Sequence, residues 1–563
     1  MDLKKQIAID LESILSEELD YEQIYNALEV PKMSEHGDYS FPVFSLAKVY
    51  RKAPNMIAEE LAPKISSEHY EKIVPVGGYI NFFLVKKDIS QDVLKVILEE
   101  KNHYGDSDEG QNGGVPIDLS SPNIAKPMSM GHLRSTVIGN SISEIFAKMG
   151  YKPIKINYIG DWGTQFGKLI VAYKKWGDEE AIKADPIHEL LKIYVQFHEE
   201  AETNPELEVA GREWFKKLED GDPEAVALWE WFREESLSEF QRIYDMLGIT
   251  FDSYNGESFY NDKMDPVIEM LEEKNLLKSD KGADIVDLEA YDLNPALIRK
   301  SDGATLYLTR DLASAFYRIE NYNFVQALYV VGNEQAIHFK QLKAVLKEMG
   351  HDWSDNIHHI PFGLITQGGQ KLSTRKGKVI LLEEVLIEAI NAIRQQIEEK
   401  NPALENKDEI AHQVGVGAVI FHDLKNDRLN SFDFSLDDII QFEGETGPYV
   451  QYTRSRCESI LEKANWTLDQ NVPLALDDEE SWEVVKILNN FPNKVKEASV
   501  KYEPSIIAKY VIDLSQKFNR YYSKHKILED DDKKAARLAL VYATSVVIKE
   551  SLRLLGIQSP DKM

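Results

Sequence analysis

Hydrophobic and polar positions follow different periods in successive parts of the chain, and each period predicts a type of element. Residues 7–15 place apolar side chains at helical spacing, whereas residues 78–84 have the aromatic and β-branched composition of a strand. Residues 106–114 are polar and rich in glycine, which is typical of a linker. The pattern therefore predicts a small α+β domain over residues 1–105.

The next segment changes repeatedly between strand and helix periods. Residues 115–119 alternate as a strand, residues 120–130 form a proline-containing loop, and residues 131–150 carry apolar side chains at a helical period. A second strand pattern follows at residues 154–159. Strand, loop, helix and strand in this order open a doubly wound α/β sheet. We therefore predict a Rossmann-like domain with a parallel sheet over residues 115–385.

Further elements are predicted inside this domain. Residues 175–260 have a helical period and predict a helical insertion. A β-hairpin is predicted over residues 297–308, with its turn at residues 301–303. Short apolar runs predict buried strands at residues 327–331 and 360–365.

Beyond about residue 381 nearly every segment has the period of an amphipathic helix. We predict a helical connector over residues 386–440 and a C-terminal helical bundle over residues 441–563. The chain as a whole is then a multidomain α/β protein. Several domains are expected for 563 residues, because a single hydrophobic core stops growing near about 250 to 300 residues.

Charge is distributed unevenly along the chain. The sequence has 65 Lys+Arg and 95 Asp+Glu residues, which gives a formal net charge of −30. Residues 175–260 hold 22 acidic and 8 basic residues, whereas residues 441–563 hold 19 and 18. Phosphate binding depends on Lys and Arg, so an anionic partner is expected on the C-terminal part and not on the acidic insertion.

The chain has a single cysteine, Cys457. It therefore offers neither an intrachain disulfide nor a zinc site built from several thiolates, and we expect a reducing, cytoplasmic location. Its first 20 residues have no uninterrupted apolar core of the kind found in signal peptides. No stretch approaches the roughly 20 apolar residues that span a bilayer, so no membrane partner is expected.

Residues 120–135, with the sequence SSPNIAKPMSMGHLRS, join the end of a predicted strand to the start of a helix. Free backbone N–H groups and the helix dipole favour phosphate at such a position. Gly131 would let a nucleotide approach the backbone, and His132 could donate to a phosphate or ribose oxygen. The alternative is an ordinary loop with a histidine at the helix start. Taken alone, the segment favours that alternative.

A second segment, residues 371–378, has the sequence KLSTRKGK and follows Gly368 and Gly369. Four cations in eight residues, next to glycines, suit a loop that closes over a polyphosphate. A solvated basic loop would have the same composition. The position of the segment, after the last predicted sheet strand, favours the phosphate interpretation.

Together the two segments resemble the HIGH and KMSKS signatures of class I aminoacyl-tRNA synthetases, and within that class they most resemble the arginyl-tRNA synthetase family. Residues 120–168, which include GDWGTQFG at 160–167, look like the longer catalytic signature of that family. The further matches are the segments 35–39, 307–311, 332–335, 338–339, 447–452 and 554–557. The resemblance thus spans essentially the whole chain.

Two positions depart from the signatures. Ser129 stands where HIGH has its first histidine, and Thr374 stands where KMSKS has its second lysine. In the family, a lysine just upstream of HIGH is thought to compensate for a degenerate KMSKS, and this lysine corresponds to Lys126. Ser129 can donate one hydrogen bond but carries no positive charge.

The resemblance also implies which residues form each site. The expected arginine-binding residues are Asp118, Asn123, Tyr307, Asp311 and Gln335. The expected ATP-binding residues are Ser121, Ser129, Gly131, His132, Lys371 and Arg375. The expected catalytic residues are Lys126, His132, Lys371 and Ser373. No resident metal or zinc is implied, and Mg²⁺ would enter with ATP.

Physical chemistry agrees with arginine as the amino acid. A guanidinium is planar, permanently charged and carries five donors, so a selective site needs carboxylates around it. Asp118 lies near the C-terminal end of a strand, where α/β sheets place ligands, and it should point away from the core. For Asp311 the alternative is that it, or Thr309, simply caps the following helix.

The resemblance implies activation of L-arginine by ATP and transfer to the 3′-terminal adenosine of arginine tRNA, by a monomer. Two other functions remain open: another class I synthetase, and a non-catalytic tRNA-binding paralogue. The C-terminal bundle would contact the anticodon. There, Lys517, Arg520 and Lys524 share one helical face. The interleaved aromatic residues Phe518, Tyr521 and Tyr522 are expected to belong to the bundle core, with only the basic side chains facing outward.

Overall fold

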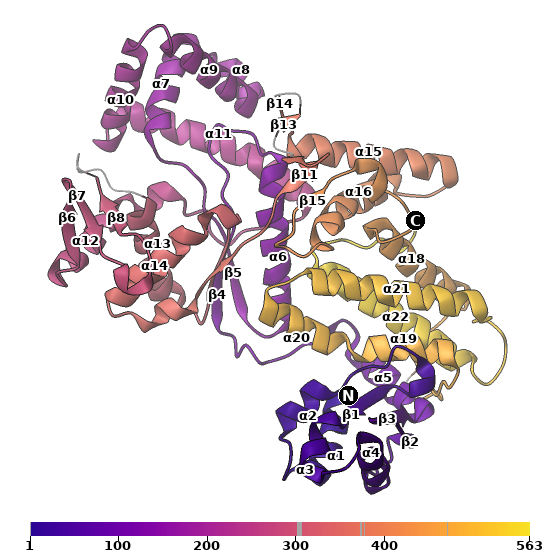
Figure 1. Cartoon of the computed structure of the whole chain (residues 1–563). Coiled ribbons are helices and arrows are strands. Elements are labelled where there is room, and N and C mark those ends of the chain that lie inside the picture. Colours follow the sequence, from indigo (N-terminus) through magenta and orange to yellow (C-terminus); the bar gives the residue numbers. More distant parts are fainter. Residues whose placement is uncertain (1, 301–306, 372–373, 376–377, 470) are drawn as a thin grey trace.

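The computed structural model describes residues 2–300, 307–371, 374–375, 378–469 and 471–563. The chain forms an N-terminal domain, a central domain built on a parallel sheet, a helical insertion and a C-terminal helical region (Figure 1). Within the described residues no helix is both long and apolar enough to cross a membrane.

The N-terminal domain packs helices on a three-stranded antiparallel sheet of order β1-β3-β2. Its strands are β1 (Tyr39–Pro42), β2 (Tyr70–Val76) and β3 (Tyr79–Leu84). Its helices are α1 (Leu3–Leu15), α2 (Tyr21–Ala27), α3 (Ala47–Tyr50), α4 (Pro54–Leu61) and α5 (Lys86–Glu100). Asp20 begins α2 with a capping box to Gln23, which satisfies backbone N–H groups that the first helical turn leaves free.

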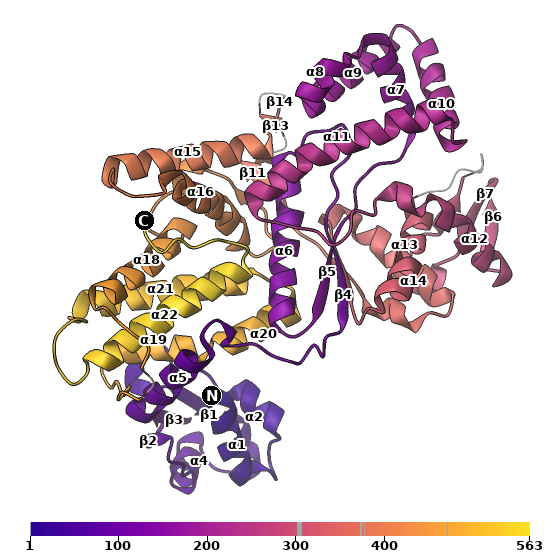
Figure 2. The same ribbon diagram turned by 180° about the vertical axis from the view of Figure 1, so that it is seen from behind.

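The central sheet has four parallel strands in the order β10-β9-β4-β5. The strands are β4 (Gly114–Ser120), β5 (Lys152–Asn157), β9 (Ala327–Val330) and β10 (Ile357–Ile360). Helix α6 (Leu133–Lys148) lies on one side of the sheet, and α13 (Tyr307–Tyr322) and α14 (Ala336–Glu348) lie on the other in both views (Figures 1 and 2). The order of the strands reverses between β4 and β9, and in open α/β sheets ligands bind at such a point.

The insertion is entirely helical. Its helices are α7 (Thr164–Trp176), α8 (Glu179–Ala184), α9 (Pro186–Ala201), α10 (Glu206–Glu219) and α11 (Pro223–Leu247). Helices α7 to α10 lie away from the C-terminal region, whereas the end of α11 reaches α15 (Leu382–Lys400), where Arg242 donates to Glu383 at 2.9 Å (Figure 1). The fully buried carboxylate of Asp161 fixes the insertion to the sheet domain. This carboxylate accepts bonds from Arg233 Nε and from Ser258 N and Oγ, each 2.8 Å long. The signature segment 160–167 is therefore also a structural anchor.

The structure differs from two strand predictions. The strand β8 (Ala296–Arg299) pairs with β7 (Ala283–Val286), which pairs with β6 (Leu277–Asp280), whereas the hairpin predicted over residues 297–308 would have paired it with residues 304–308, of which 304–306 lie outside the described residues. The predicted turn at 301–303 lies outside the described residues, and Tyr307 already begins α13. Alternation along the chain shows that a segment can be a strand, but it does not show which strand it pairs with.

The strand predicted at residues 360–365 is wrong, because these residues join two strands. One is β10 and the other is β11 (Ile365–Gln367), which belongs to a different sheet of order β12-β11-β15. The remaining strands are β12 (Gln370–Lys371), β13 (Thr374–Arg375), β14 (Lys378–Val379) and β15 (Phe432–Asp433). Between β10 and β11 the chain leaves the parallel sheet.

The rest of the chain is helical, as predicted. Its helices are α15 (Leu382–Lys400), α16 (Lys407–Leu424), α17 (Leu436–Ile439), α18 (Gly447–Lys463), α19 (Glu479–Asn489), α20 (Phe491–Lys501), α21 (Ser505–Lys524) and α22 (Lys534–Leu554). One further helix, α12 (Met264–Glu273), lies in the central domain. The N-terminal domain sits against the C-terminal bundle (Figure 2), where buried Asp38 accepts a 2.7 Å bond from Trp482 Nε1. The predicted fold class, a multidomain α/β protein with a doubly wound parallel sheet, is confirmed.

Candidate active site

The loop that follows β4 turns into α6 through a short 3₁₀ turn, Met130–His132. Ser129 caps this turn, because its side chain accepts from Gly131 N at 3.3 Å. In return the backbone N–H of Ser129 donates to Nδ1 of His132 at 3.0 Å. An Nδ1 that accepts a hydrogen bond carries no proton, so His132 is neutral and its Nε2 is a donor. Burial lowers the pKa of His132, in agreement with this state.

The structure joins the signature loop to the chain that follows the predicted basic segment. Met130 N donates to Ile380 O at 3.1 Å, and Leu382 N donates to Met128 O at 2.9 Å. Residues 380–382 begin two positions beyond the basic segment 371–378, so these backbone bonds hold the chain just after that segment against the signature loop. Lys371 lies in β12 and Arg375 in β13, while Ser373 lies outside the described residues.

The position of Asn123, in the loop after β4, requires a glycine at residue 160. Its backbone forms a parallel bridge with Gly160, and Ile124 N donates to Gly160 O at 3.1 Å. The side-chain oxygen of Asn123 occupies the space that a Cβ on residue 160 would need. Gly160 is thus required for this close approach, and Asn123 itself remains exposed.

Asp311 lies near the start of α13 and has two polar partners from other elements. His338 Nε2 of α14 is 2.6 Å from Oδ2 of Asp311, and the Tyr158 hydroxyl donates to Oδ1 at 3.3 Å. The Asp311 side chain keeps 20% of its surface exposed. The capping alternative does not describe this arrangement, because the carboxylate contacts α14 and the end of β5.

Asp118 lies on β4 and is buried, contrary to the expectation that it would point away from the core. Its Oδ1 is 2.7 Å from a terminal nitrogen of Arg318, a residue of α13 whose side chain is fully buried. Burial raises the pKa of Asp118 to about 6, although the nearby guanidinium opposes this rise. The predicted ligand of a substrate guanidinium therefore already holds a guanidinium of the chain itself.

Several of the other predicted site residues are exposed. Tyr307 is 70% exposed at the start of α13. The other exposed members of the predicted set are Ser121, Lys126, Gly131 and Gln335. Tyr307 and Arg310 line a hollow of about 540 Å³ together with Trp162 and Gln165 of the signature segment. This hollow lies between the signature segment, α10 of the insertion and the starts of α12 and α13.

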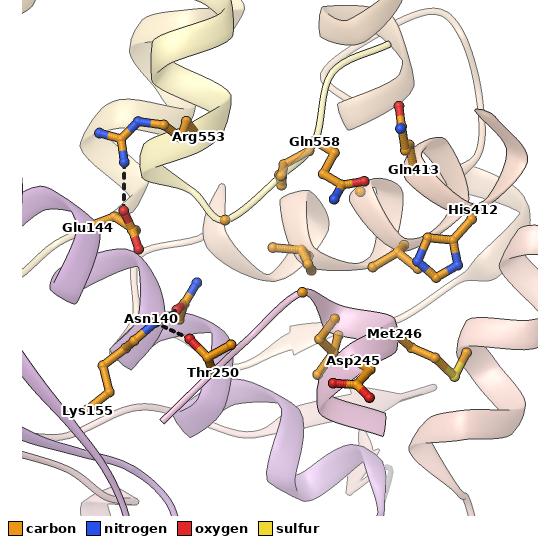
Figure 3. A pocket seen from close by; sticks show the side chains of 17 residues that line it. Asn140, Glu144, Lys155, Asp245, Met246, Thr250, His412, Gln413, Arg553 and Gln558 are labelled. Carbon is orange, nitrogen blue, oxygen red and sulfur yellow. Dashed lines mark hydrogen bonds and ion pairs between the residues drawn. The ribbon is translucent and has the colours of Figure 1, made fainter. Parts of the chain in front are cut away.

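A second pocket, of about 390 Å³, lies elsewhere and contains none of the predicted site residues. It is formed where α6, the end of α11, α16 and the turn after α22 meet (Figure 3). In it Arg553 pairs with Glu144 at 2.6 Å, and Lys155 Nζ lies 3.5 Å from Thr250. Its residues join the sheet domain to the C-terminal helices.

Sequence reasoning missed three polar residues beside the predicted site. Arg318 holds Asp118, Tyr158 donates to Asp311, and Glu257 lies 3.8 Å from Arg310. Burial raises the pKa of Glu257 to about 7, and Arg310 opposes that rise. Arg318 follows Asp311 by seven residues, or two helical turns, so helical spacing could have placed it on the same face.

The C-terminal bundle presents an exposed aromatic and cationic surface, formed by Tyr452, Arg456 and Tyr522. The Arg456 guanidinium lies 5.2 Å from the Tyr452 ring and 5.0 Å from the Tyr522 ring. Each tyrosine is 41% exposed. Phe518 and Tyr521 are fully buried, as expected, but the expectation that Tyr522 also belongs to the bundle core is wrong.

The basic face predicted nearby is partly neutralised within the chain. Lys517 pairs with Glu483 at 3.2 Å, and Lys524 pairs with Glu480. Arg520 is exposed. Arg456, which the predicted basic face did not include, lies near the exposed rings of Tyr452 and Tyr522.

Three family models match the chain. Residues 1–84 match the arginyl-tRNA synthetase N-terminal domain, residues 93–436 match the catalytic domain of the class I tRNA synthetases (R), and residues 450–563 match the DALR anticodon-binding domain. The catalytic model alone covers more than half of the chain. The parallel sheet, the signature loop and these matches define a class I aminoacyl-tRNA synthetase.

Similar proteins of known family show which family within this class the chain belongs to. The chain is 65% identical to the arginine–tRNA ligase of Enterococcus faecalis and 62% identical to that of Pediococcus pentosaceus, over the full length of both chains in each case. The solved arginyl-tRNA synthetase of Thermus thermophilus is 26% identical over both full chains, with a TM-score of 0.78. That of Plasmodium falciparum, at 24% identity, shares the fold with a TM-score of 0.83. The chain belongs to the arginyl-tRNA synthetase family, the ligases that join arginine to tRNA. The alternative of another class I synthetase is wrong.

Proposed function

We propose that the chain activates L-arginine with ATP and passes it to the 3′-terminal adenosine of arginine tRNA at the edge of the parallel sheet. The arginine carboxylate attacks the α-phosphate of ATP, giving arginyl-adenylate and pyrophosphate. A hydroxyl of the terminal ribose, normally the 2′-hydroxyl in this class, then attacks the adenylate carbonyl and AMP leaves. Mg²⁺ enters as the counter-ion of ATP.

The observation that carries this proposal is the backbone pairing between the signature loop and residues 380–382. This pairing supports a site in which Lys371 and Ser373 act on the same nucleotide as the start of α6, where Ser121, Ser129, Gly131 and His132 would receive the phosphates and ribose. Catalysis then consists of positioning and of stabilising phosphate charge. Lys126, exposed on the same loop, would supply the cation that Thr374 and Ser129 do not.

The amino acid would lie across the switch point between β4 and β9. Asn123 and Gln335 are proposed to hold the α-amino and carboxylate groups, and Tyr307 and Asp311 the guanidinium. Asp311 suits this role because its partners, His338 and Tyr158, orient the carboxylate without supplying a permanent charge. For Asp118, direct contact with the guanidinium of the substrate remains a prediction, because its carboxylate already pairs with Arg318.

The deciding experiment is arginine-dependent exchange of pyrophosphate into ATP, with and without tRNA, followed by charging of bulk tRNA with labelled arginine. We expect exchange and charging with arginine and not with other amino acids. A chain that binds tRNA but turns over no ATP under either condition would instead be a non-catalytic paralogue.

The neutral state of His132 predicts a pH dependence. Because burial lowers its pKa, His132 should remain a neutral Nε2 donor as the pH falls through about 6.5, the ordinary histidine value. The ratio of wild-type to His132→Asn exchange rates, measured across pH, should therefore stay constant down to that value. Other titrating groups affect both proteins and cancel in the ratio. A ratio that falls already above pH 6.5 would contradict the assignment.

The C-terminal surface of Tyr452, Arg456 and Tyr522 is proposed to contact unpaired bases of the tRNA. Stacking of one base on an aromatic ring contributes about 1 to 3 kcal/mol. Tyr452→Ala should weaken tRNA binding by about that amount and leave its salt dependence unchanged, because phosphate contacts set that dependence. Binding across a salt series measures both quantities.

Tyr291→Ala is the matched control for this prediction, since Tyr291 is also an exposed tyrosine (37%) but lies in the sheet domain. It should leave tRNA affinity unchanged. Equal losses in the two variants would remove the surface from the proposed interface.

We also propose that the chain works as a monomer in the cytoplasm. Cys457 is fully buried, and burial raises the pKa of its thiol, so it is a poor candidate for a disulfide between copies. Light scattering during size-exclusion chromatography tests the monomer directly.

A further inference from the structure

Arg134, two residues beyond His132 in the first turn of α6, is a buried cation that contacts a distant part of the chain. Its side chain is 2% exposed. Its Nε donates to Oδ1 of Asp423 at 3.3 Å, and its Nη1 donates to Asn430 O at 2.9 Å. The guanidinium carbon lies 4.9 Å from the centre of the Phe432 ring, a contact that attracts a cation. The start of α6 is thus fixed to the end of α16, to the loop after it and to β15.

The strand that Arg134 contacts supports the beginning of the basic segment. β15 pairs in parallel with β11, which pairs antiparallel with β12, the strand that contains Lys371. Asp433 of β15 also accepts a 3.3 Å bond from Gly369 N, in the turn between β11 and β12. Both views show β11 and β15 beside the start of α6 (Figures 1 and 2). A continuous set of contacts therefore leads from Arg134 to the backbone of Lys371.

The basic segment is held on both sides, but by different kinds of contact. After the segment, residues 380–382 bond to the signature loop through the backbone. Before the segment, the connection to α6 includes the side chain of Arg134. Backbone bonds do not depend on the identity of a side chain, whereas the second connection does. A substitution of Arg134 can therefore shift Lys371 relative to His132.

Stability by itself does not account for the pair of Arg134 and Asp423. Both side chains are buried, and among the described residues neither Nη2 of Arg134 nor Oδ2 of Asp423 has a hydrogen-bond partner. Removing two charges from water is costly unless their hydrogen bonds are satisfied, and apolar side chains of similar volume often stabilise a protein at least as well. A role in placing the hairpin of β11 and β12 gives a reason for the pair.

We propose that Arg134 is a positioning residue for adenylate formation, which fixes the hairpin of β11 and β12 so that Lys371 meets the phosphates of ATP at the start of α6. The proposal rests on the function proposed above. Arg134 acts through Asp423 and Phe432 without touching ATP. A lysine in its place would keep the positive charge but would lack the planar group that donates in two directions and lies on a ring.

A double-mutant cycle of Arg134 and Lys371 tests this proposal in the full-length enzyme. Arg134→Lys should slow adenylate formation, measured per active site in single turnovers, on the order of tenfold, because small displacements of a catalytic group have large effects on rate. Transfer from preformed arginyl-adenylate should stay close to wild type. In the Lys371→Ala background, Arg134→Lys should slow adenylate formation less than about twofold, since the group that it positions is absent. Equal losses in the two backgrounds would overturn the proposal.

Arg537→Lys is the matched control. Arg537 of α22 is also a buried arginine, with a side chain 9% exposed, which pairs with Asp531 at 2.8 Å and donates to Ile527 O at 3.0 Å. We expect a wild-type rate of adenylate formation per active site for this variant. If Arg134→Lys, like this control, lowers only the number of active sites and not the rate at each, Arg134 serves stability and the proposal is overturned.

The test does not depend on the folding of Arg134→Lys. If thermal unfolding shows that this variant does not fold, Phe432→Leu takes its place in the cycle, because it keeps the ion pair with Asp423 and removes the ring beside the guanidinium. It should slow adenylate formation, and less so in the Lys371→Ala background. No loss, or the same loss in both backgrounds, would overturn the proposal.

Lys371→Ala separates this proposal from the proposed function. An unchanged rate of adenylate formation in that variant would overturn the proposed phosphate site itself. A slowed rate in Lys371→Ala, together with independent effects of Arg134 and Lys371 in the cycle, would overturn only the role of Arg134.

Discussion

Asp311→Asn is expected to lower kcat/KM for arginine more than about 100-fold while the KM for ATP stays nearly unchanged. The substitution keeps the shape of the side chain but removes the charge that faces the substrate guanidinium. Loss of one partner of a buried charge pair costs about 3 to 5 kcal/mol, and every 1.4 kcal/mol corresponds to about tenfold. Arginine-dependent pyrophosphate exchange at varied arginine and ATP measures both constants.

Glu320→Gln provides the matched control, because it removes a carboxylate from the exposed face of the same helix. We expect wild-type constants for this variant. If Asp311→Asn charges tRNA as well as the wild type does, the guanidinium is bound elsewhere.

Lys126→Ala is expected to slow formation of the adenylate by about 30- to 1000-fold and to spare transfer from preformed arginyl-adenylate. A charged donor to a transferring phosphate contributes roughly 2 to 4 kcal/mol in an organised site. Lys126 is exposed on the signature loop, where it can reach a bound phosphate. Single-turnover measurements of the two half-reactions separate these effects.

Lys152→Ala, which removes an exposed lysine from the start of β5, is the control. It should affect neither half-reaction. Equal damage by Lys126→Ala to both steps would exclude a role specific to ATP.

Because Thr374 replaces a lysine of the KMSKS signature, adding Thr374→Lys to Lys126→Ala should restore part of the rate of adenylate formation. An absence of rescue would argue against compensation.

The local pattern of hydrophobic and polar residues was sufficient to predict most helices and strands of the central domain. The alternation at residues 115–119 and the helical period at 131–150 correspond to β4 and α6, because each period reflects which face of one element is buried. Local pattern failed where two distant segments had to be matched. The partner of β8 is β7, which precedes it in the chain, and nothing between residues 297 and 308 specifies that choice.

The candidate site shows the same difference between what neighbouring residues indicate and what distant contacts decide. The motifs indicated Asn123, His132 and Asp311 as candidates because signatures are contiguous in sequence, and the spacing of Arg318 from Asp311 was also available there. The residue that each of these side chains contacts in the folded chain could not be read from the sequence. Asp118 could not be seen to face Arg318, since 200 positions separate them along the chain.

The sequence by itself indicated the family, most of the elements and the candidate segments for phosphate binding, because these depend on local periodicity and on contiguous motifs. Only the tertiary structure decided which charges neutralise one another. It joined residues 128–130 to residues 380–382 and Asp311 to His338, and it buried Asp118 against Arg318. Contacts of this kind depend on how the chain returns to the sheet edge, and burial then strengthens each electrostatic interaction by removing water.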